Sequence, residues 1–223
     1  QDVTVRFAPT SVKDYLASLA IDNNSEQGYQ EVTLIGIGSD ATGTTVTDID
    51  GNTYRTVKIG DQWWMAENLK VTHYRNSDAI PNVTDYRIWE VLTTGAYCVY
   101  GNNSENIETY GRLYNWHAVN DNRQIAPAGW HVPNSAEWQT LFSLLGDEWY
   151  AGGKLKATGT SHWSDPNTGA TNETGFSALP GGYRDYLGGF SERGMTAGFW
   201  SSTKSLSEFA GIHVMRYDNP NII

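Results

Sequence analysis

The 223-residue sequence has one cysteine, few charged residues and no long apolar run. Because Cys98 has no second cysteine to pair with, an intrachain disulfide and a metal site built from several thiolates are excluded. No apolar stretch approaches the roughly 20 residues that a membrane-spanning helix needs. Clusters of Lys and Arg are also missing, and the net charge is −10. We therefore expect no nucleic-acid partner, no membrane insertion and no electrostatic docking on anionic lipid.

Aromatic residues and glycines are abundant instead. Nine Trp, thirteen Tyr and 23 scattered Gly indicate a sizeable core connected by many tight turns. The chain has no signal peptide and starts with Gln1 rather than Met, which is typical of a processed product. We expect an exported protein.

The clearest local pattern predicts a helix over residues 135–145. Asn134 and Glu137 have the spacing of a capping box. Behind them, apolar residues recur at helical spacing, and Gly146 ends the pattern. These apolar residues are Trp138, Leu141, Phe142, Leu144 and Leu145. We expect one face of this helix to be buried in the core.

Weaker patterns predict the other elements. Residues 112–120 have the spacing of a second helix, and residues 152–158 of a shorter one. A hairpin turns at Gly60-Asp61, and strands are expected at 97–100, 198–203 and 211–217. Between the last helix and these final strands lies a long loop rich in Gly and Pro. The fold class predicted is therefore α+β.

The first 38 residues alternate apolar and polar positions and read as strands. The alternating positions are Val3, Val5 and Phe7, then Tyr15 to Ile21, then Val32 to Ile37. Residues 39–47 are small and polar, which is typical of a linker. We expect residues 1–38 and 48–223 to form separate domains.

The stretch from Asp48 to Asn52 allows two interpretations. Asp48, Asp50 and Asn52 are spaced by two, as in a calcium loop. However, position 59 is Ile where an EF-hand needs a bidentate carboxylate, and Asp50-Gly51 is a common hairpin turn. We favour the turn. A second oxygen-rich group, which could bind calcium or form ordinary turns, comprises Asp165, Asn167, Asn172 and Glu173.

Catalytic motifs are scarce. The five histidines show no pair at metal-ligand spacing, and no Gly-x-Ser-x-Gly elbow occurs. Asp147 and Glu148 are adjacent carboxylates just after the predicted helix, where solvation is the simpler explanation. We therefore predict no catalytic residues and no resident cofactor, and we interpret Cys98 as a buried apolar residue.

Aromatic and Arg residues gather in the last part of the sequence, a composition that is typical of recognition surfaces. The alternative is that several of them belong to the core. The predicted ligand-binding residues are Tyr183, Arg184, Tyr186, Phe190, Arg193, Trp200, His213, Arg216 and Tyr217.

A series of motifs carries a family resemblance over about residues 46–223. The motifs read IGDQWWMAENLKVTHY, YGRLYNWHAV, APAGWHVPNSAEWQTL, GATNETGFSALPGGYRD and GFWSST. Together they closely resemble the Fibrobacter succinogenes major paralogous domain of bacterial surface and secreted proteins. That resemblance implies a C-type-lectin-like fold, related to formylglycine-generating enzymes and to retroelement-diversified receptors.

The resemblance also implies how the domain works. In the receptor relatives the C-terminal region carries the binding face, which matches the predicted ligand-binding residues. The enzyme relatives use paired cysteines or copper-binding thiolates, and this chemistry cannot be carried over to a chain with Cys98 alone. Two departures from the family are Ala126, where members commonly have Cys, and a missing final strand after Ile223.

The first 38 residues resemble the closing half of an immunoglobulin-like domain of the abnormal-spindle and hydin type. Its early strands are missing, as is the expected neighbour of the strand near Val214–Tyr217. An open sheet edge is a template for another strand. We therefore expect either trimmed ends or an edge that another chain fills.

These observations predict an extracellular adhesion or recognition module of a bacterial surface protein that binds glycan or protein. One alternative is a structural stalk or fibre subunit. A second is a hydrolase acting through scattered carboxylates such as Asp185 or Glu192.

Overall fold

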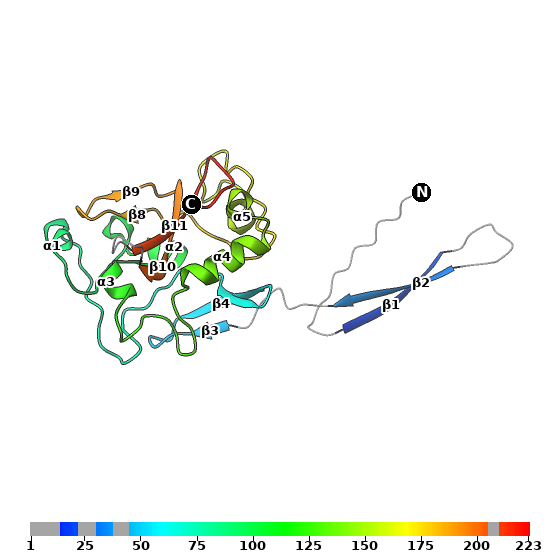
Figure 1. Cartoon of the computed structure of the whole chain (residues 1–223), viewed down its shortest axis with the longest axis horizontal. Coiled ribbons are helices and arrows are strands. Elements are labelled where there is room, and N and C mark those ends of the chain that lie inside the picture. Colours follow the sequence, from blue (N-terminus) through cyan, green and yellow to red (C-terminus); the bar gives the residue numbers. More distant parts are fainter. Residues whose placement is uncertain (1–13, 22–29, 38–44, 205–209) are drawn as a thin grey trace. The chain divides into compact units, whose positions relative to one another are not determined.

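The computed structural model describes residues 14–21, 30–37, 45–204 and 210–223. The chain forms two compact units, Gln1–Gly43 and Thr44–Ile223. In the first unit, β1 (Asp14–Ile21) pairs antiparallel with β2 (Gln30–Ile37) (Figure 1). Both were predicted as strands, whereas the strand predicted around Val5 lies outside the described residues.

The second unit begins with a three-stranded antiparallel sheet in the order β3-β4-β5. It consists of β3 (Thr45–Thr47), β4 (Thr53–Ile59) and β5 (Gln62–Met65). Strands β4 and β5 are joined at Gly60, whose φ of 60° suits a residue without a side chain. The predicted hairpin at Gly60-Asp61 is thus confirmed.

Short elements follow. These are α1 (Tyr86–Glu90), β6 (Tyr97–Cys98), a 3₁₀ turn η1 (Tyr100–Asn102), α2 (Asn106–Tyr110), β7 (Leu113–Tyr114) and α3 (Trp116–Val119). The helix predicted over residues 112–120 was therefore wrong in its first half. Leu113 and Tyr114 are extended because they pair with Cys98 and Tyr97, a contact that helical spacing could not reveal.

The two main helices are α4 (Ser135–Leu144) and α5 (Glu148–Leu155). The capping box predicted for α4 is present, with Asn134 accepting from the Glu137 amide and Glu137 accepting from the Asn134 amide. Leu144 is 57% exposed, contrary to the prediction, because the buried stripe runs through Trp138, Leu141 and Phe142 to Leu145. Helix α5 starts four residues earlier than predicted, since Asp147 caps it by accepting from Trp149.

Two hairpins close the unit: β8 (Tyr183–Arg184) with β9 (Phe190–Ser191), and β10 (Thr196–Lys204) with β11 (Ala210–Arg216). The last two strands were predicted. The expectation that β11 lacks a neighbour is corrected, because Val214 and Ile223 exchange main-chain hydrogen bonds of 2.9 and 3.0 Å. The chain thus returns along the edge of β11.

The core of the second unit lies between α4, α5 and the strands β10 and β11. Trp138, Leu141, Leu155 and Met215 are among its most buried side chains. A smaller cluster around Val71 and a third around Trp89, Ala96 and Cys98 extend it toward α1. None of the described helices is long and apolar enough to cross a membrane. The architecture is mixed α+β with small antiparallel sheets.

Candidate functional site

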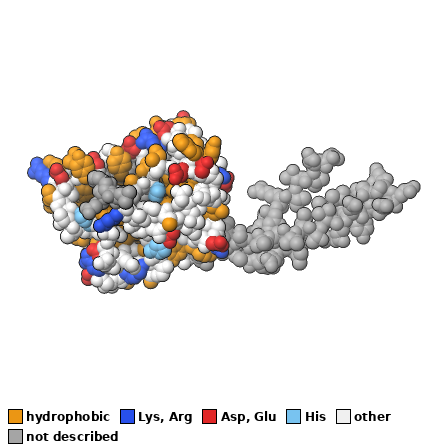
Figure 2. Space-filling view, viewed as in Figure 1, with side chains coloured by type: hydrophobic (Ala, Val, Ile, Leu, Met, Phe, Trp, Pro, Cys, Tyr) orange, Lys and Arg blue, Asp and Glu red, His pale blue; other side chains and the backbone are white. Residues whose placement is uncertain are grey.

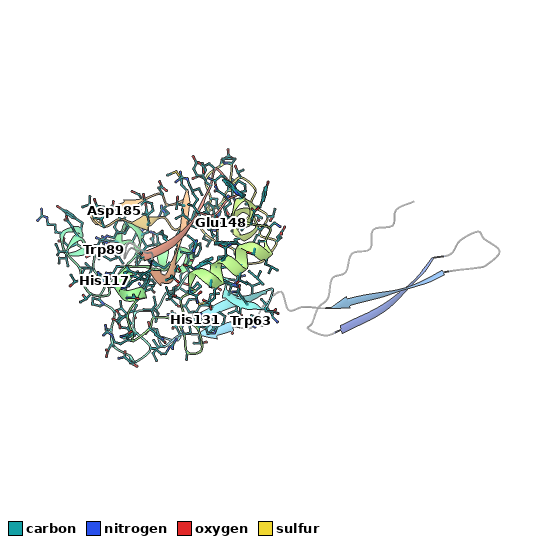
Figure 3. The ribbon with its side chains drawn as sticks, in the orientation of Figure 1. Trp63, Trp89, His117, His131, Glu148 and Asp185 are labelled. Carbon is teal, nitrogen blue, oxygen red and sulfur yellow. The ribbon has the colours of Figure 1, made fainter. Side chains whose placement is uncertain are left out.

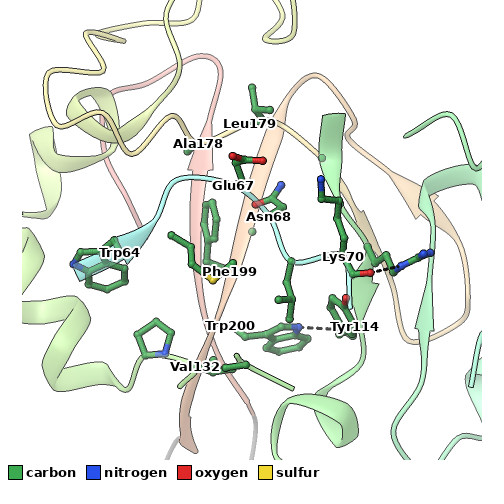
Figure 4. Close-up of a pocket in the computed structure, with 18 of the residues that line it drawn as sticks. Trp64, Glu67, Asn68, Lys70, Tyr114, Val132, Ala178, Leu179, Phe199 and Trp200 are labelled. Carbon is green, nitrogen blue, oxygen red and sulfur yellow. Dashed lines mark hydrogen bonds between the residues drawn. The ribbon is translucent and has the colours of Figure 1, made fainter. Parts of the chain in front are cut away.

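A cleft of about 1060 Å³ lies in the second unit (Figure 4). Six segments that are far apart in the sequence line it. These are residues 62–70, 108–114, 125–133, 176–184, 198–200 and the start of α4. The cleft is therefore a product of the tertiary fold.

Closely packed aromatic rings, tilted or edge-on to one another, form one side of the cleft. The rings of Trp64 and Trp138 lie 4.8 Å apart, and Phe199 lies 5.9 Å from Trp138. Phe176 completes the group at 5.6 Å from Phe199. Trp64, Trp138 and Phe176 are buried, which fixes this aromatic side before any ligand arrives.

A second aromatic group lies around Trp200. Its indole N–H donates to the main-chain oxygen of Tyr114 at 2.9 Å, and its ring lies 5.7 Å from Trp116. Tyr114 in turn donates to the oxygen of Val71 at 2.7 Å, and burial raises the pKa of its hydroxyl well above the ordinary range. Tyr114 is thus a neutral hydrogen-bond donor.

The charged residues of the cleft largely neutralise one another. Two ion pairs lie along it, Arg55–Glu67 at 3.1 Å and Lys70–Glu108 at 3.4 Å, and the His131 ring is hydrogen-bonded to the Glu137 carboxylate at 2.7 Å. Arg112 donates to the oxygen of Lys70 and lies over the ring of Tyr97. An aromatic cleft with few free charges suits a neutral ligand with apolar faces.

Three of the nine predicted ligand-binding residues line this cleft, namely Tyr183, Arg184 and Trp200. Tyr183 is exposed. Arg184 is held between the rings of Trp89 and Phe190, at 4.3 and 4.8 Å.

The other predicted residues lie outside the cleft. Tyr186 is 79% exposed beyond β8, whereas Phe190 packs on the cluster around Trp89. His213 lies against the rings of Trp138 and Phe142, and Tyr217 packs against the main core. Arg216 forms ion pairs with Glu192 and Asp218. Arg193 lies over the ring of Tyr100. The nine residues therefore do not form one continuous surface.

Exposed apolar side chains gather at two other places on the second unit (Figure 2). One group belongs to α1 and the β8–β9 turn and comprises Tyr86, Ile88, Val91, Tyr186 and Leu187. Trp89 and Asp185 lie close together at this group (Figure 3), where the Trp89 indole N–H donates to the main-chain oxygen of Asp185 at 3.1 Å. The other group, near α5, comprises Leu144, Trp149 and Tyr150.

The carboxylates considered for catalysis lie away from the cleft. Asp147 caps α5, Asp185 accepts from the Gly189 amide, and Glu192 accepts from Thr196 and Arg216. Cys98 is buried, and burial raises the pKa of its thiol. Among the described residues, no group of three or more His, Cys, Asp or Glu is placed to hold a metal ion.

The two oxygen-rich stretches form local hydrogen bonds. Asp48 accepts from the amides of Asp50 and Asn52 in the turn between β3 and β4, so the favoured turn is present. In the second stretch, Asn172 bonds Ser177 and Glu173 pairs with Lys154. Asn167 donates to the oxygens of Ala157 and Gly159.

Sequence reasoning missed most of the cleft, including the exposed Trp63 and the half-buried Trp130. Both stand in Trp- and Gly-containing stretches that had been assigned to hairpins and bends. The adjacent pair Trp63-Trp64 was the available signal, because two neighbouring residues of a strand point to opposite faces and cannot both enter the same core.

Residues 57–217 match the Fibrobacter succinogenes major domain. No curated protein and no solved structure matches the chain.

Proposed function

The chain belongs to the Fibrobacter succinogenes major domain family, and we propose that it is a non-catalytic recognition module of a bacterial surface or secreted protein. Its ligand, a glycan or a protein, enters the aromatic cleft. We further propose that the second unit has a C-type-lectin-like fold and that the first unit belongs to an immunoglobulin-like sandwich.

The observation that carries this proposal is the cleft itself. Its volume of about 1060 Å³ is at the upper end of the roughly 300–1,000 Å³ of typical ligand pockets. Pre-positioned aromatic rings lose little conformational freedom when a ligand stacks on them. A recognition role accounts for such a cavity, whereas a stalk subunit has no need of it.

The lining favours binding over catalysis. Its carboxylates Glu67, Glu108 and Glu137 are each paired with a cationic or imidazole side chain. Hydrolysis of a glycosidic bond needs two carboxylates, about 5–10 Å apart, that are free to act on a substrate.

The experiment is a screen of a glycan array and a displayed peptide library with the full chain. Trp63 and Trp149 provide a matched pair, since they are 48% and 69% exposed and only Trp63 lines the cleft. We expect Trp63→Ala to weaken binding of the selected ligands at least about tenfold, the typical effect of losing an interface tryptophan. Trp149→Ala should leave binding unchanged.

Three outcomes would contradict the proposal. One is that neither library yields a ligand. Another is that Trp149→Ala weakens binding as much as Trp63→Ala does. The third is turnover of an arrayed glycan by the purified wild-type chain, which would favour the hydrolase.

A further inference from the structure

Strand β10 has one paired edge and one edge that is open at its centre. Along its first edge it pairs with β11, from Thr196 opposite Arg216 to Ser201 opposite Gly211. On its second edge, the described residues pair with it only near its two ends. There, Gly182 donates to the Thr196 oxygen at 2.9 Å, and Ser202 donates to the Pro133 oxygen at 2.8 Å.

The pairing pattern fixes the direction of the main-chain groups between these two points. Val214 exchanges both hydrogen bonds with Ile223, so its N–H and C=O point away from β10. Gly198 lies opposite Val214, and its own N–H and C=O must therefore point away from β11. The Thr196 oxygen, two residues earlier, faces the same second edge.

Gly198 and Trp200 therefore direct main-chain groups into the cleft, which both residues line. No described residue is a hydrogen-bond partner for the Gly198 N–H, the Gly198 C=O or the Trp200 N–H. The main-chain oxygen of Trp200 accepts a hydrogen bond from the indole N–H of Trp138 at 3.4 Å. Gly198 is exposed, so its main-chain groups can be reached from the cleft.

We propose that the cleft binds an extended polypeptide segment, which adds a strand to the open edge of β10 at Gly198 and Trp200. This inference rests on the proposed function, that the cleft is a ligand site, and names its partner class. The spacing of the free main-chain groups along β10 favours a peptide over a glycan. An N–H and C=O of one residue, followed two residues later by a further N–H, is the pattern that a partner strand complements.

The dimensions agree with a short strand. Six residue steps separate Thr196 from Ser202, which corresponds to about 20 Å of extended chain. Alternate side chains of the incoming segment would lie against the aromatic rings on the two faces of β10, where Phe199 and Trp200 point in opposite directions. The lining carries four Lys or Arg side chains and three Glu side chains, so we expect a segment with little net charge.

The test uses the full chain and heptapeptides selected from a random library displayed on phage. Amide hydrogen exchange of the ¹⁵N-labelled protein is measured by NMR with and without the selected peptide. We expect the amides of Gly198 and Trp200 to exchange at least about tenfold more slowly in the complex. The amides of Ala197 and Phe199, which already face β11, should change little.

A matched pair of variants tests the same hydrogen bond. Gly198→Ala keeps the N–H, and its Cβ would meet the Ile212 side chain at an ordinary 3.4 Å. Gly198→Pro removes the N–H. We expect Gly198→Ala to bind within about twofold of the wild type and Gly198→Pro to lose at least about tenfold, the effect of one main-chain hydrogen bond.

N-methylated peptides test the inference even if Gly198→Pro does not fold. Methylation of alternate amides in one phase should abolish binding, and methylation in the other phase should not. Equal binding of both methylated forms would overturn the inference.

The outcomes also separate this inference from the proposed function. A glycan that binds in a Trp63-dependent way, while no heptapeptide is enriched, overturns the strand addition and leaves the recognition role intact. A peptide that is insensitive to Trp63→Ala and does not protect Gly198 overturns both. Protection of Gly198 and Trp200 supports both.

Discussion

The ammonium nitrogen of Lys156 lies 2.9 Å from the main-chain oxygen of Arg216, and the lysine is fully buried. The same nitrogen donates to the oxygens of Thr168 and Asn219 at 2.9 and 3.0 Å. Burial lowers the pKa of Lys156 to about 8, and Asp218 opposes this change. At neutral pH the charged Lys156 side chain therefore connects the C-terminal end of α5 to the loop at Thr168, to the last residue of β11 and to Asn219 beyond it.

Replacing Lys156 by Met should destabilise the second unit by about 2–4 kcal/mol, because three enclosed main-chain oxygens would each lose their donor. Urea unfolding at pH 7 measures this change. Lys154→Met, two residues earlier in the last turn of α5, is the control, since Lys154 forms a partly exposed ion pair with Glu173 and its loss should cost less than about 1 kcal/mol. Equal midpoints for the two variants would show that the three bonds to Lys156 contribute nothing.

Asp48 organises the turn between β3 and β4. It accepts from the amides of Asp50 and Asn52, from the Asn52 side chain at 2.9 Å and from the buried Tyr54 hydroxyl. We expect Asp48→Ala to lower the free energy of unfolding by about 2–3 kcal/mol, since several donors lose a charged acceptor. Asp61→Ala, at the exposed turn between β4 and β5, should change it by less than about 0.5 kcal/mol.

Local signals in the sequence were sufficient for the elements that depend on neighbours in the chain. Helix α4 was predicted from its capping box, and β10 and β11 were predicted as strand-like runs. The predicted helix near Trp116 was too long because Leu113 and Tyr114 pair with a strand about 16 residues earlier in the sequence.

The candidate site could be predicted only in part, because its lining is assembled from segments that range from residue 62 to residue 200. Composition identified Tyr183, Arg184 and Trp200, which do line the cleft. It gave no indication that the half-buried His213 packs on the buried Trp138. Nor does the sequence reveal that the open edge belongs to β10, since that depends on where the chain end pairs.

Arg184 should be irreplaceable by Lys. Its guanidinium lies between two aromatic rings and donates to the oxygens of Val83, Thr84 and Gly188 at 2.6, 3.0 and 3.0 Å. A lysine cannot match this planar set of donors. We expect Arg184→Lys to reduce stability by about 2–3 kcal/mol and to loosen the contact between α1 and β8.

Hydrogen exchange would locate the effect of Arg184→Lys, with faster exchange of the amides in α1 and the β8–β9 turn. Arg87→Lys is the matched control, because Arg87 is exposed and its guanidinium contacts the neighbouring Tyr86. A variant Arg184→Lys with wild-type stability and unchanged exchange would show that charge alone suffices at this position.

His213 should make the fold sensitive to mild acid. Burial lowers the pKa of its imidazole below the ordinary 6.5, and the rings of Trp138 and Phe142 lie 4.9 and 5.1 Å away. Below pH 6.5 the unfolded chain binds a proton at this histidine more readily than the folded chain does, so stability is lost as the pH falls through that range. His213→Phe keeps the ring packing and removes the proton site, and it should lose less stability than the wild type between pH 7.5 and 5. The urea midpoint at several pH values measures this difference directly. His117→Phe, at an exposed histidine, should retain the full wild-type loss, and identical pH profiles for all three proteins would rule out a contribution from His213.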